Sequence, residues 1–396
     1  MRDYISKYFK LGRVSSNFFL VILSVPVMLF SCSSSSDPLH QFTTVVIDSD
    51  QVDDFYELDF IKNDIEIHYL MNDSELLIGN VQHMDFLGSN IVLFDNSAHQ
   101  ILIFNSSYEL IKRVESKGEG PGEFKYLECF FVDEEKEEIV IFDSRLLKFL
   151  TYDAKGEFIK EKKVNYFARD LFKVGNKWLI NNAWSDDKSN PYQIFITNEN
   201  FEIISKLKPQ NKSIVSSIAN ATPFKKIDSN ILTYLEPLSD TVYQLNSALD
   251  NLEPLILFDF RDLKYPDELL LDKSARQFFS EISKGRYNGW VRDLWKSGDE
   301  MLFQFLETNG LGKMQTVMAL YQEEKLSLFS KFTICGGLAV FYPKMVNEGK
   351  YFSIISSEEL NHYIENNDMR NVHPRLLSLF QKLNNNESTL IISFKL

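Results

Sequence analysis

Two glutamates in a glycine-rich run are the first residues of this sequence that could do chemistry. Glu119 and Glu123 lie in Lys117-Gly-Glu-Gly-Pro-Gly-Glu-Phe124, where glycine amides could surround an anion. The spacing differs from the Gly-x-x-x-x-Gly-Lys-Ser/Thr phosphate loop, and Pro121 and Gly122 stand where a dinucleotide-binding turn needs a helix start. The run is better explained as a connection between strands, in which glycine permits positive φ and proline stiffens the turn. Both glutamates remain candidates for lining a ligand site.

Three further residues are candidates for ligand binding. Asp95 and Asp143 each follow an apolar run, so their carboxylates could face a common site or could accept hydrogen bonds from nearby backbone amides in a turn. Trp184 stands close to Asp186 and Asp187, and an aromatic ring beside carboxylates is a common way to bind a sugar. These types of residue favour a binding site without defining a reaction.

No catalytic or metal-binding motif accompanies these candidates. The sequence contains no His-Glu-x-x-His, Gly-x-Ser-x-Gly or Cys-x-x-Cys, and its 6 histidines are scattered. It therefore predicts no catalytic residue, no metal site and no cofactor. The net charge of −14 and the lack of a basic stripe also exclude nucleic acid as a partner, because an acidic surface repels phosphate backbones.

The elements that must position these candidates form a repeat. Three short apolar runs separated by polar turns recur with an offset of 48 residues: Ile91–Asp95, Ile101–Asn105 and Glu109–Lys112 match Ile139–Asp143, Phe149–Asp153 and Glu157–Lys160. A third copy matches the first at an offset of 93 and contains Ile196, Asn198, Glu202 and Ile204. A period of about 40 to 50 residues in all-β patterning is typical of propeller blades.

Weaker strand patterns continue to the C-terminal run Leu390–Phe394, so we expect one propeller over residues 42–396. The segments Pro266–Ile282 and Ser356–Asn366 have helical spacing or a helix-start signal, and Pro374–Leu383 could be a third helix. The fold class predicted is all-β, a β-propeller with short helical insertions. We also expect the strand near Val45 to close the ring beside a C-terminal strand.

The N-terminus has the features of a targeting segment. Four basic residues precede the 13-residue uncharged run Phe18–Phe30, which is too short to span a bilayer. The following Leu29-Phe-Ser-Cys32 resembles the lipobox of a bacterial lipoprotein signal, although Phe30 departs from the usual small or aliphatic residue. The resemblance implies a signal peptide at residues 1–31, an acylated Cys32, and a tether at residues 32–41 that attaches the chain to the cell envelope, at the outer membrane. The alternative is an ordinary anchor helix that happens to end at a cysteine.

The glycine-rich run between two repeat units, together with Ser239-Asp-Thr-Val-Tyr243 and Leu255-Ile-Leu-Phe-Asp259, resembles the NHL-like six-bladed β-propeller lipoproteins of Bacteroidetes-type bacteria. The first copy departs from that pattern, because Ser106-Ser-Tyr108 stands where the turn usually carries glycine. The resemblance implies six blades and an exported, lipid-anchored protein. It implies no substrate and no catalytic set.

These observations predict a non-catalytic binding or scaffolding protein for a glycan, a peptide or a partner protein, with the oligomeric state left open. An alternative is a propeller hydrolase or lyase that acts on polysaccharide or peptide, since distant residues can meet at the axis of a propeller. That alternative predicts a cluster of Asp, Glu, His or Arg at the axis. A pure assembly subunit would instead expose an apolar patch on one face of the propeller.

Overall fold

The computed structural model describes residues 43–48, 52–70, 76, 78–115, 118–182, 191–210, 222–228, 231–271, 273–334, 337–366, 373–374, 376–377 and 389–396. The chain divides after Gln41, and the fold described below is that of Phe42–Leu396. Among the described residues, no helix is both long and apolar enough to cross a membrane.

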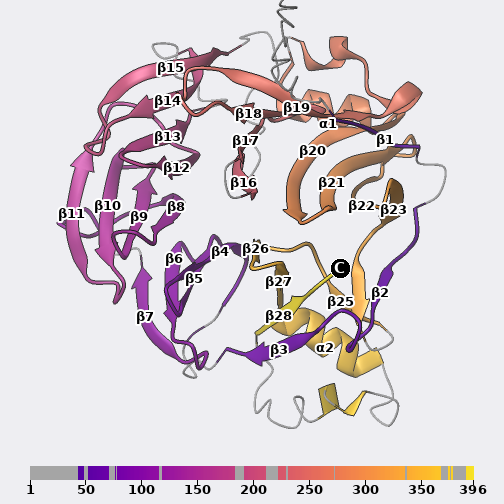
Figure 1. Cartoon of the computed structure of the whole chain (residues 1–396), viewed down its shortest axis with the longest axis horizontal. Coiled ribbons are helices and arrows are strands. Elements are labelled where there is room, and N and C mark those ends of the chain that lie inside the picture. The colour runs from indigo at the N-terminus through magenta and orange to yellow at the C-terminus, as the bar shows by residue number, and fades with distance from the viewer. Residues whose placement is uncertain are drawn as a thin grey trace, which may run out of the picture. The chain divides into compact units, whose positions relative to one another are not determined.

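The first three blades are four-stranded antiparallel sheets whose strands follow one another along the chain (Figure 1). Their middle strands are apolar runs that are buried on both faces, because each sheet packs between two neighbouring sheets. The strands are β4 (Val81–Leu87), β5 (Asn90–Asp95), β6 (Gln100–Phe104) and β7 (Leu110–Glu115); β8 (Leu127–Asp133), β9 (Glu138–Asp143), β10 (Lys148–Asp153) and β11 (Phe158–Lys163); β12 (Asp170–Val174), β13 (Lys177–Asn181), β14 (Tyr192–Thr197) and β15 (Ile203–Pro209).

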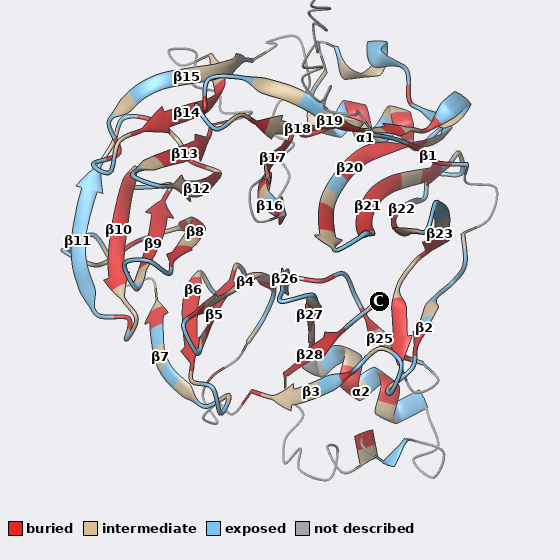
Figure 2. Cartoon of the chain, viewed as in Figure 1, coloured by how far each residue is buried: buried red, intermediate tan, exposed pale blue. Residues whose placement is uncertain are grey.

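The 48-residue repeat corresponds to the first two of these blades. Leu93 pairs with Leu102 across β5 and β6, and Ile141 pairs with Leu150 at the equivalent position of β9 and β10. Outer strands are less buried: every residue of β11 is exposed, as Figure 2 shows in pale blue. The prediction of blades from this repeat is therefore confirmed.

The remaining strands complete the ring. The fourth sheet contains β16 (Phe224–Asp228), β17 (Ile231–Leu235), β18 (Thr241–Leu245), β19 (Leu252–Asp259) and, at its outer edge, β1 (Thr43–Val46). The other sheets contain β20 (Arg286–Ser297), β21 (Glu300–Asn309), β22 (Met314–Gln322) and β23 (Lys325–Phe329); β2 (Tyr56–Leu58), β24 (Phe332–Ile334) and β25 (Leu338–Val340); and β26 (Met345–Asn347), β27 (Lys350–Ile355), β28 (Leu390–Phe394) and β3 (Glu66–Tyr69).

The described residues thus form seven sheets, and the prediction of six blades is wrong. The unexpected blade is the sheet β2-β24-β25, whose strands have three residues each and are too short to give a repeat pattern in the sequence. It joins a segment near the start of the propeller to one near its end, since β2 runs parallel to β24.

The ring closes through a different N-terminal strand from the one predicted. The last sheet combines β3 with the C-terminal strand β28, in which Ile392 pairs with Ile67. The strand near Val45 is β1, which runs parallel to β19 in the fourth sheet and does not touch the C-terminal strand's sheet. Two strands from opposite ends of the propeller therefore share one blade, in which β3 covers the edge of β28.

Two of the predicted helical segments are confirmed. The first, Pro266–Ile282, contains η2 (Asp267–Leu270) and α1 (Ala275–Ile282) and follows η1 (Arg261–Leu263), and the second is α2 (Ser357–Asn366). Helix α1 begins at Ser274, whose side chain accepts from the Gln277 backbone while the Gln277 side chain returns a bond to the Ser274 amide. Most of the segment predicted as a third helix lies outside the described residues.

Candidate functional site

A cavity of about 190 Å³ lies where the inner strands of six blades meet. Figure 1 shows these strands, β4, β8, β12, β16, β20 and β26, around the centre of the ring. The sheet β2-β24-β25 contributes no residue to the lining. The cavity is lined by His83, Met84, Asp85, Phe130, Phe131, Asp170, Leu171, Phe172, Thr222, Phe224, Lys225, Lys226, Leu294, Trp295, Lys296, Lys344, Met345 and Val346.

Aromatic rings form much of the wall. The His83 ring lies edge-on to Phe130, with centroids 4.9 Å apart, and Phe131 meets Phe172 in the same manner at 5.4 Å. Trp295 is 96% buried, and its Nε1–H has no acceptor among the described residues. A buried donor without an acceptor is costly, because the group has lost its hydrogen bonds to water.

An ion pair between neighbouring blades lies beside this tryptophan. Lys225 of β16 contacts Asp293 of β20, and its Nζ stands 4.2 Å from the centre of the Trp295 ring. Burial lowers the pKa of Lys225 and raises the pKa of Asp293, while the attraction between the two charges opposes both shifts. The two groups compensate each other, so the pair adds no net charge to the site.

Two other aspartates of the cavity have strongly raised pKa values. Burial raises the pKa of Asp170 to about 8, although its carboxylate accepts from the Phe224 amide at 3.3 Å. Burial also raises the pKa of Asp85 to about 7, against the effect of a 2.8 Å bond from the Phe86 amide. Both carboxyl groups are therefore protonated in a large fraction of molecules at neutral pH, and a protonated carboxyl can donate a hydrogen bond.

Lys344 is a largely buried charged group of the cavity that has no ion-pair partner among the described residues. Among the described residues, no carboxylate forms an ion pair with its Nζ, which instead stands 4.6 Å from the centre of the Tyr342 ring. Burial lowers the pKa of Lys344 to about 8, and attraction to Asp293 and Glu359 opposes the shift. Burial also lowers the pKa of the nearby His83 to about 3, which keeps that imidazole neutral.

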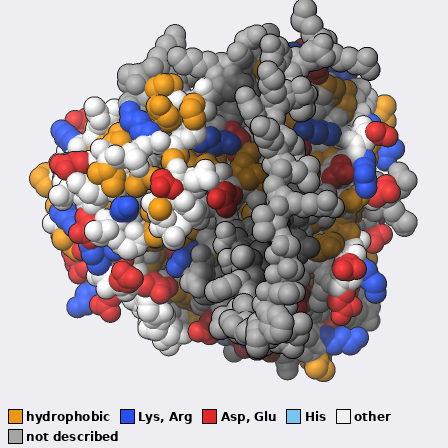
Figure 3. Space-filling view, turned by 45° about the horizontal axis from the view of Figure 1, so that its top comes forward, with side chains coloured by type: hydrophobic (Ala, Val, Ile, Leu, Met, Phe, Trp, Pro, Cys, Tyr) orange, Lys and Arg blue, Asp and Glu red, His pale blue; other side chains and the backbone are white. Residues whose placement is uncertain are grey.

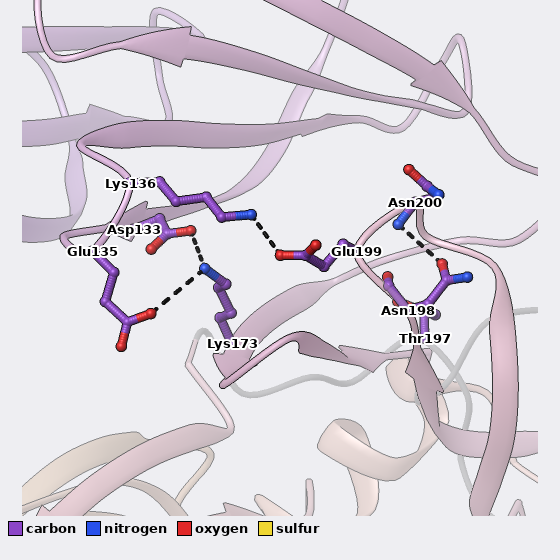
Figure 4. A network of polar contacts seen from close by, with 8 residues as sticks. All are labelled: Asp133, Glu135, Lys136, Lys173, Thr197, Asn198, Glu199 and Asn200. Carbon is purple, nitrogen blue, oxygen red and sulfur yellow. Dashed lines mark hydrogen bonds and ion pairs between the residues drawn. The ribbon is translucent and has the colours of Figure 1, made fainter.

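A wider depression of about 440 Å³ adjoins the cavity and shares Asp85, Phe131, Phe172 and Lys226 with it. Its rim includes the polar network of Figure 4, in which Lys173 of β12 contacts Asp133 and Glu135 of the preceding blade. Lys136 reaches Glu199, at the turn between β14 and β15, over 2.6 Å. These contacts hold two blades together beside the route into the cavity.

The predicted aspartates lie in turns and do not line this cavity. Asp95 is fully buried and accepts from the Gly79 amide at 2.9 Å, the Ser97 hydroxyl at 2.7 Å and the Gln100 side chain at 2.9 Å. Asp143 accepts in the same way from the amides of Lys125, Arg145 and Leu146. The structure therefore gives both carboxylates the turn-forming contacts that the sequence left as one of two alternatives.

The other predicted residues are not brought together either. Glu123 accepts from the Gly120 amide at 2.8 Å within its own turn, and Glu119 is exposed and forms an ion pair with Lys125. Neither lines the axial cavity. Trp184 and Cys32 lie outside the described residues. The described residues also contain no group of three or more His, Cys, Asp or Glu side chains arranged to hold a metal ion.

The residues that line the axial cavity were not predicted from the sequence, because the inner strands repeat less clearly than the middle strands of the blades. One signal was present: Asp85, Asp170 and Lys225 interrupt the short apolar strands that precede the strong repeat runs. A charged residue within a strand that is buried on both faces needs a partner or a function. On the outer surface, by contrast, acidic and basic side chains are interspersed with apolar ones (Figure 3).

The fold and the cavity define the chain as a β-propeller with a polar, aromatic-walled axial site. A family model described as a domain of unknown function, DUF4934, matches residues 48–395, and the chain belongs to this family. The ring of sheets confirms the propeller part of the predicted resemblance, whereas the family match does not support its NHL-like assignment.

Solved structures show the same fold. A Bacteroides fragilis protein classed as exported is 17% identical, with a TM-score of 0.71, over 89% of this chain and 99% of that chain. A member of the DUF4221 family from Bacteroides vulgatus is 12% identical, with a TM-score of 0.53, over 84% of this chain and 96% of that chain. No curated protein matches the chain.

Proposed function

We propose that the protein is a non-catalytic binding protein that holds a small ligand, or the end of a glycan or peptide, in its axial cavity. The observation that carries this proposal is the lining of the cavity, where aromatic rings and ionisable groups from six blades surround an accessible space. Ligand sites usually combine apolar walls with a few polar groups, in volumes of about 300–1,000 Å³. The volume of about 190 Å³ is smaller, which favours a small molecule or one end group of a longer chain.

A substitution that fills the cavity tests this proposal. We expect monosaccharides, amino acids or dipeptides to include a compound that raises the melting temperature of the wild type, because a ligand at a hundred times its Kd stabilises by about 2.7 kcal/mol. Thr222→Trp, which places an indole in the cavity, should abolish the shift. Ser89→Trp is the matched control, because Ser89 lies in the exposed turn between β4 and β5. A ligand that stabilises both variants equally would refute binding at the axis.

A hydrolase or lyase acting on polysaccharide or peptide is the second candidate. The pKa values of about 7 for Asp85 and about 8 for Asp170 favour it, because a general acid or base works best when its pKa is near the operating pH. Product formation from a bound oligosaccharide or peptide, lost in Asp170→Asn, would establish this candidate. It would contradict the non-catalytic proposal.

We also propose that the protein is exported and attached to the cell envelope through a lipid on Cys32, with the outer membrane as its location. The proposal rests on the N-terminal sequence and is supported by the similarity to a Bacteroides protein classed as exported. Metabolic labelling with a fatty acid should mark the wild type and leave Cys32→Ala unmarked. Label that persists in Cys32→Ala, or is missing from the wild type, would rule out the lipid anchor.

A further inference from the structure

Four of the charged side chains that line the axial cavity are lysines, Lys225, Lys226, Lys296 and Lys344. Lys344 has a positive charge with no ion-pair partner among the described residues. The other lysine buried at the axis, Lys225, already has its carboxylate in Asp293. A molecule that enters this space binds most tightly if it carries hydrogen-bond acceptors and a negative charge.

The aspartates of the cavity do not oppose such a ligand. Asp170 and Asp85 have pKa values raised to about 8 and about 7, so near neutral pH they are protonated in many molecules and can donate to an anion. His83 stays neutral because burial lowers its pKa to about 3. The lining is therefore positively charged on balance, because it contains Lys225, Lys226, Lys296 and Lys344 against the carboxyl groups of Asp85 and Asp170, although the whole chain has a net charge of −14.

We propose that the axial cavity binds a small organic carboxylate, with the carboxylate group on Lys344 and a ring against the aromatic wall. The inference rests on the proposed binding function and specifies the ligand class for that site. The ring is expected because Phe130, Phe172 and Trp295 all line the same space of about 190 Å³. Charge-assisted hydrogen bonds of this kind are stronger than neutral ones.

Two matched series of probes separate charge from shape. Galacturonate, galactose and 6-amino-6-deoxygalactose differ only at C6 of one sugar, and benzoate, benzyl alcohol and benzylamine differ only in the group on one aromatic ring, so that each series varies only the charged group. Calorimetric titration at low ionic strength should show that in at least one series the carboxylate binds about tenfold or more tightly than its neutral analogue and more tightly than the amine.

Variants assign the preference to Lys344. Lys344→Met should remove the preference for the carboxylate over its neutral analogue. Lys344→Arg, which keeps the positive charge, should retain most of that preference. Lys325→Met is the control, because Lys325 is exposed on β23 and does not line the cavity. The melting temperature of each variant, measured without ligand, shows that the protein is folded. An unchanged preference in Lys344→Met would overturn the assignment.

The dependence on pH gives an independent readout. The charged groups around Lys344 are His83 of β4, Asp293 of β20 and Glu359 of α2. A bound carboxylate raises the pKa of Lys344, so its contribution is complete below the free value of about 8 and is lost as the pH rises through the value in the complex. The advantage of the carboxylate over its neutral analogue should therefore fall as the pH rises above about 8.

The possible failures are distinguishable. Binding of only the neutral or amine probes, blocked by Thr222→Trp, would overturn the carboxylate inference and leave the binding function intact. An absence of binding in both series would refute the inference for these ring sizes. If the wider set of monosaccharides, amino acids and dipeptides also fails to bind, the proposed function itself is refuted.

Discussion

At the scale of single residues, the aspartates of the propeller fall into two groups according to what their carboxylates contact. Asp95 and Asp143, at the ends of β5 and β9, accept several hydrogen bonds from their own turns. Asp85 and Asp170, on inner strands, line the axial cavity and have raised pKa values. The first group stabilises turns, and the second is available to a ligand.

The turn role of Asp95 predicts a pH-dependent loss of stability in Asp95→Asn. Burial alone would raise the pKa of Asp95, but bonds from Gly79, Ser97, Gln100 and Ala98 outweigh this effect and hold the pKa below its ordinary value. A depressed pKa stabilises the fold above the unfolded-state pKa, and this contribution is lost as the pH falls through the folded-state value. Asp95→Asn should therefore lower the free energy of unfolding by about 1–3 kcal/mol at pH 7.

Urea unfolding at pH 7 and at acidic pH measures this effect, and the difference between variant and wild type should shrink in acid. Asp262→Asn is the control, because Asp262 is exposed in η1 and its replacement should change stability by less than about 0.5 kcal/mol. A cost in Asp95→Asn that is the same at both pH values would contradict the role of the ionised carboxylate.

The network of Figure 4 contains an ion pair buried between blades. The side chains of Asp133 and Lys173 are only 3% and 6% exposed. Removing Asp133 leaves the buried Lys173 with only the exposed Glu135, at 4.0 Å, as a partner, so Asp133→Ala should destabilise the protein by about 3 kcal/mol. Lys136→Met, which breaks the more exposed pair with Glu199, should cost less than about 1 kcal/mol. If denaturant titrations give equal losses of stability for the two variants, burial does not determine how much the Asp133–Lys173 pair contributes to stability.

At the scale of the elements, the glycine-rich connection between β7 and β8 depends on one glycine in particular. Gly122 has a φ of +73°, and an added Cβ would lie 2.6 Å from Cγ of Phe158. The Gly122 carbonyl also accepts from the Tyr152 hydroxyl at 2.9 Å, which fixes the turn against the sheet. This arrangement agrees with the expectation that the glycines of the run direct the chain between blades.

Two alanine substitutions separate backbone strain from steric overlap. Gly88 also has a positive φ, +59°, but an added Cβ there meets nothing within 4 Å. Gly88→Ala should therefore cost only the left-handed backbone strain, about 1–2 kcal/mol. Gly122→Ala should cost clearly more, because Phe158 must also move. Equal free energies of unfolding for the two variants would mean that the overlap with Phe158 does not affect stability.

The same elements show how far the sequence could predict the structure. Strands β5, β6, β9 and β10 were predictable because they are apolar on both faces and repeat locally. The pairing of β1 with β19 and of β2 with β24 joins segments that are remote in the sequence, and it depends on tertiary contacts that no local pattern contains. The candidate site escaped prediction for the same reason, since its lining comes from six separate strands.

At the scale of the whole propeller, the last blade joins strands from both ends of the propeller. Ile392 of β28 is fully buried and pairs with Ile67 of β3 on one side and with Ser353 of β27 on the other. Val46 of β1 is 40% exposed and lies at the outer edge of the fourth sheet. Both residues are aliphatic and lie in strands from the ends of the propeller, but only Ile392 lies in the strand that joins the two ends.

Alanine substitutions at Ile392 and Val46 compare how much a ring-closing strand and a strand at the edge of a sheet contribute to stability. Ile392→Ala removes buried contacts, so it should lower the free energy of unfolding by about 2–5 kcal/mol. Val46→Ala should change it by less than about 0.5 kcal/mol, as is usual for an exposed position. Because the strand shared by both ends couples all blades, we expect unfolding of Ile392→Ala followed by tryptophan fluorescence and by circular dichroism to give one coincident transition at lower denaturant. Two separated transitions would show that the last blade opens alone and that the shared strand does not couple the ring.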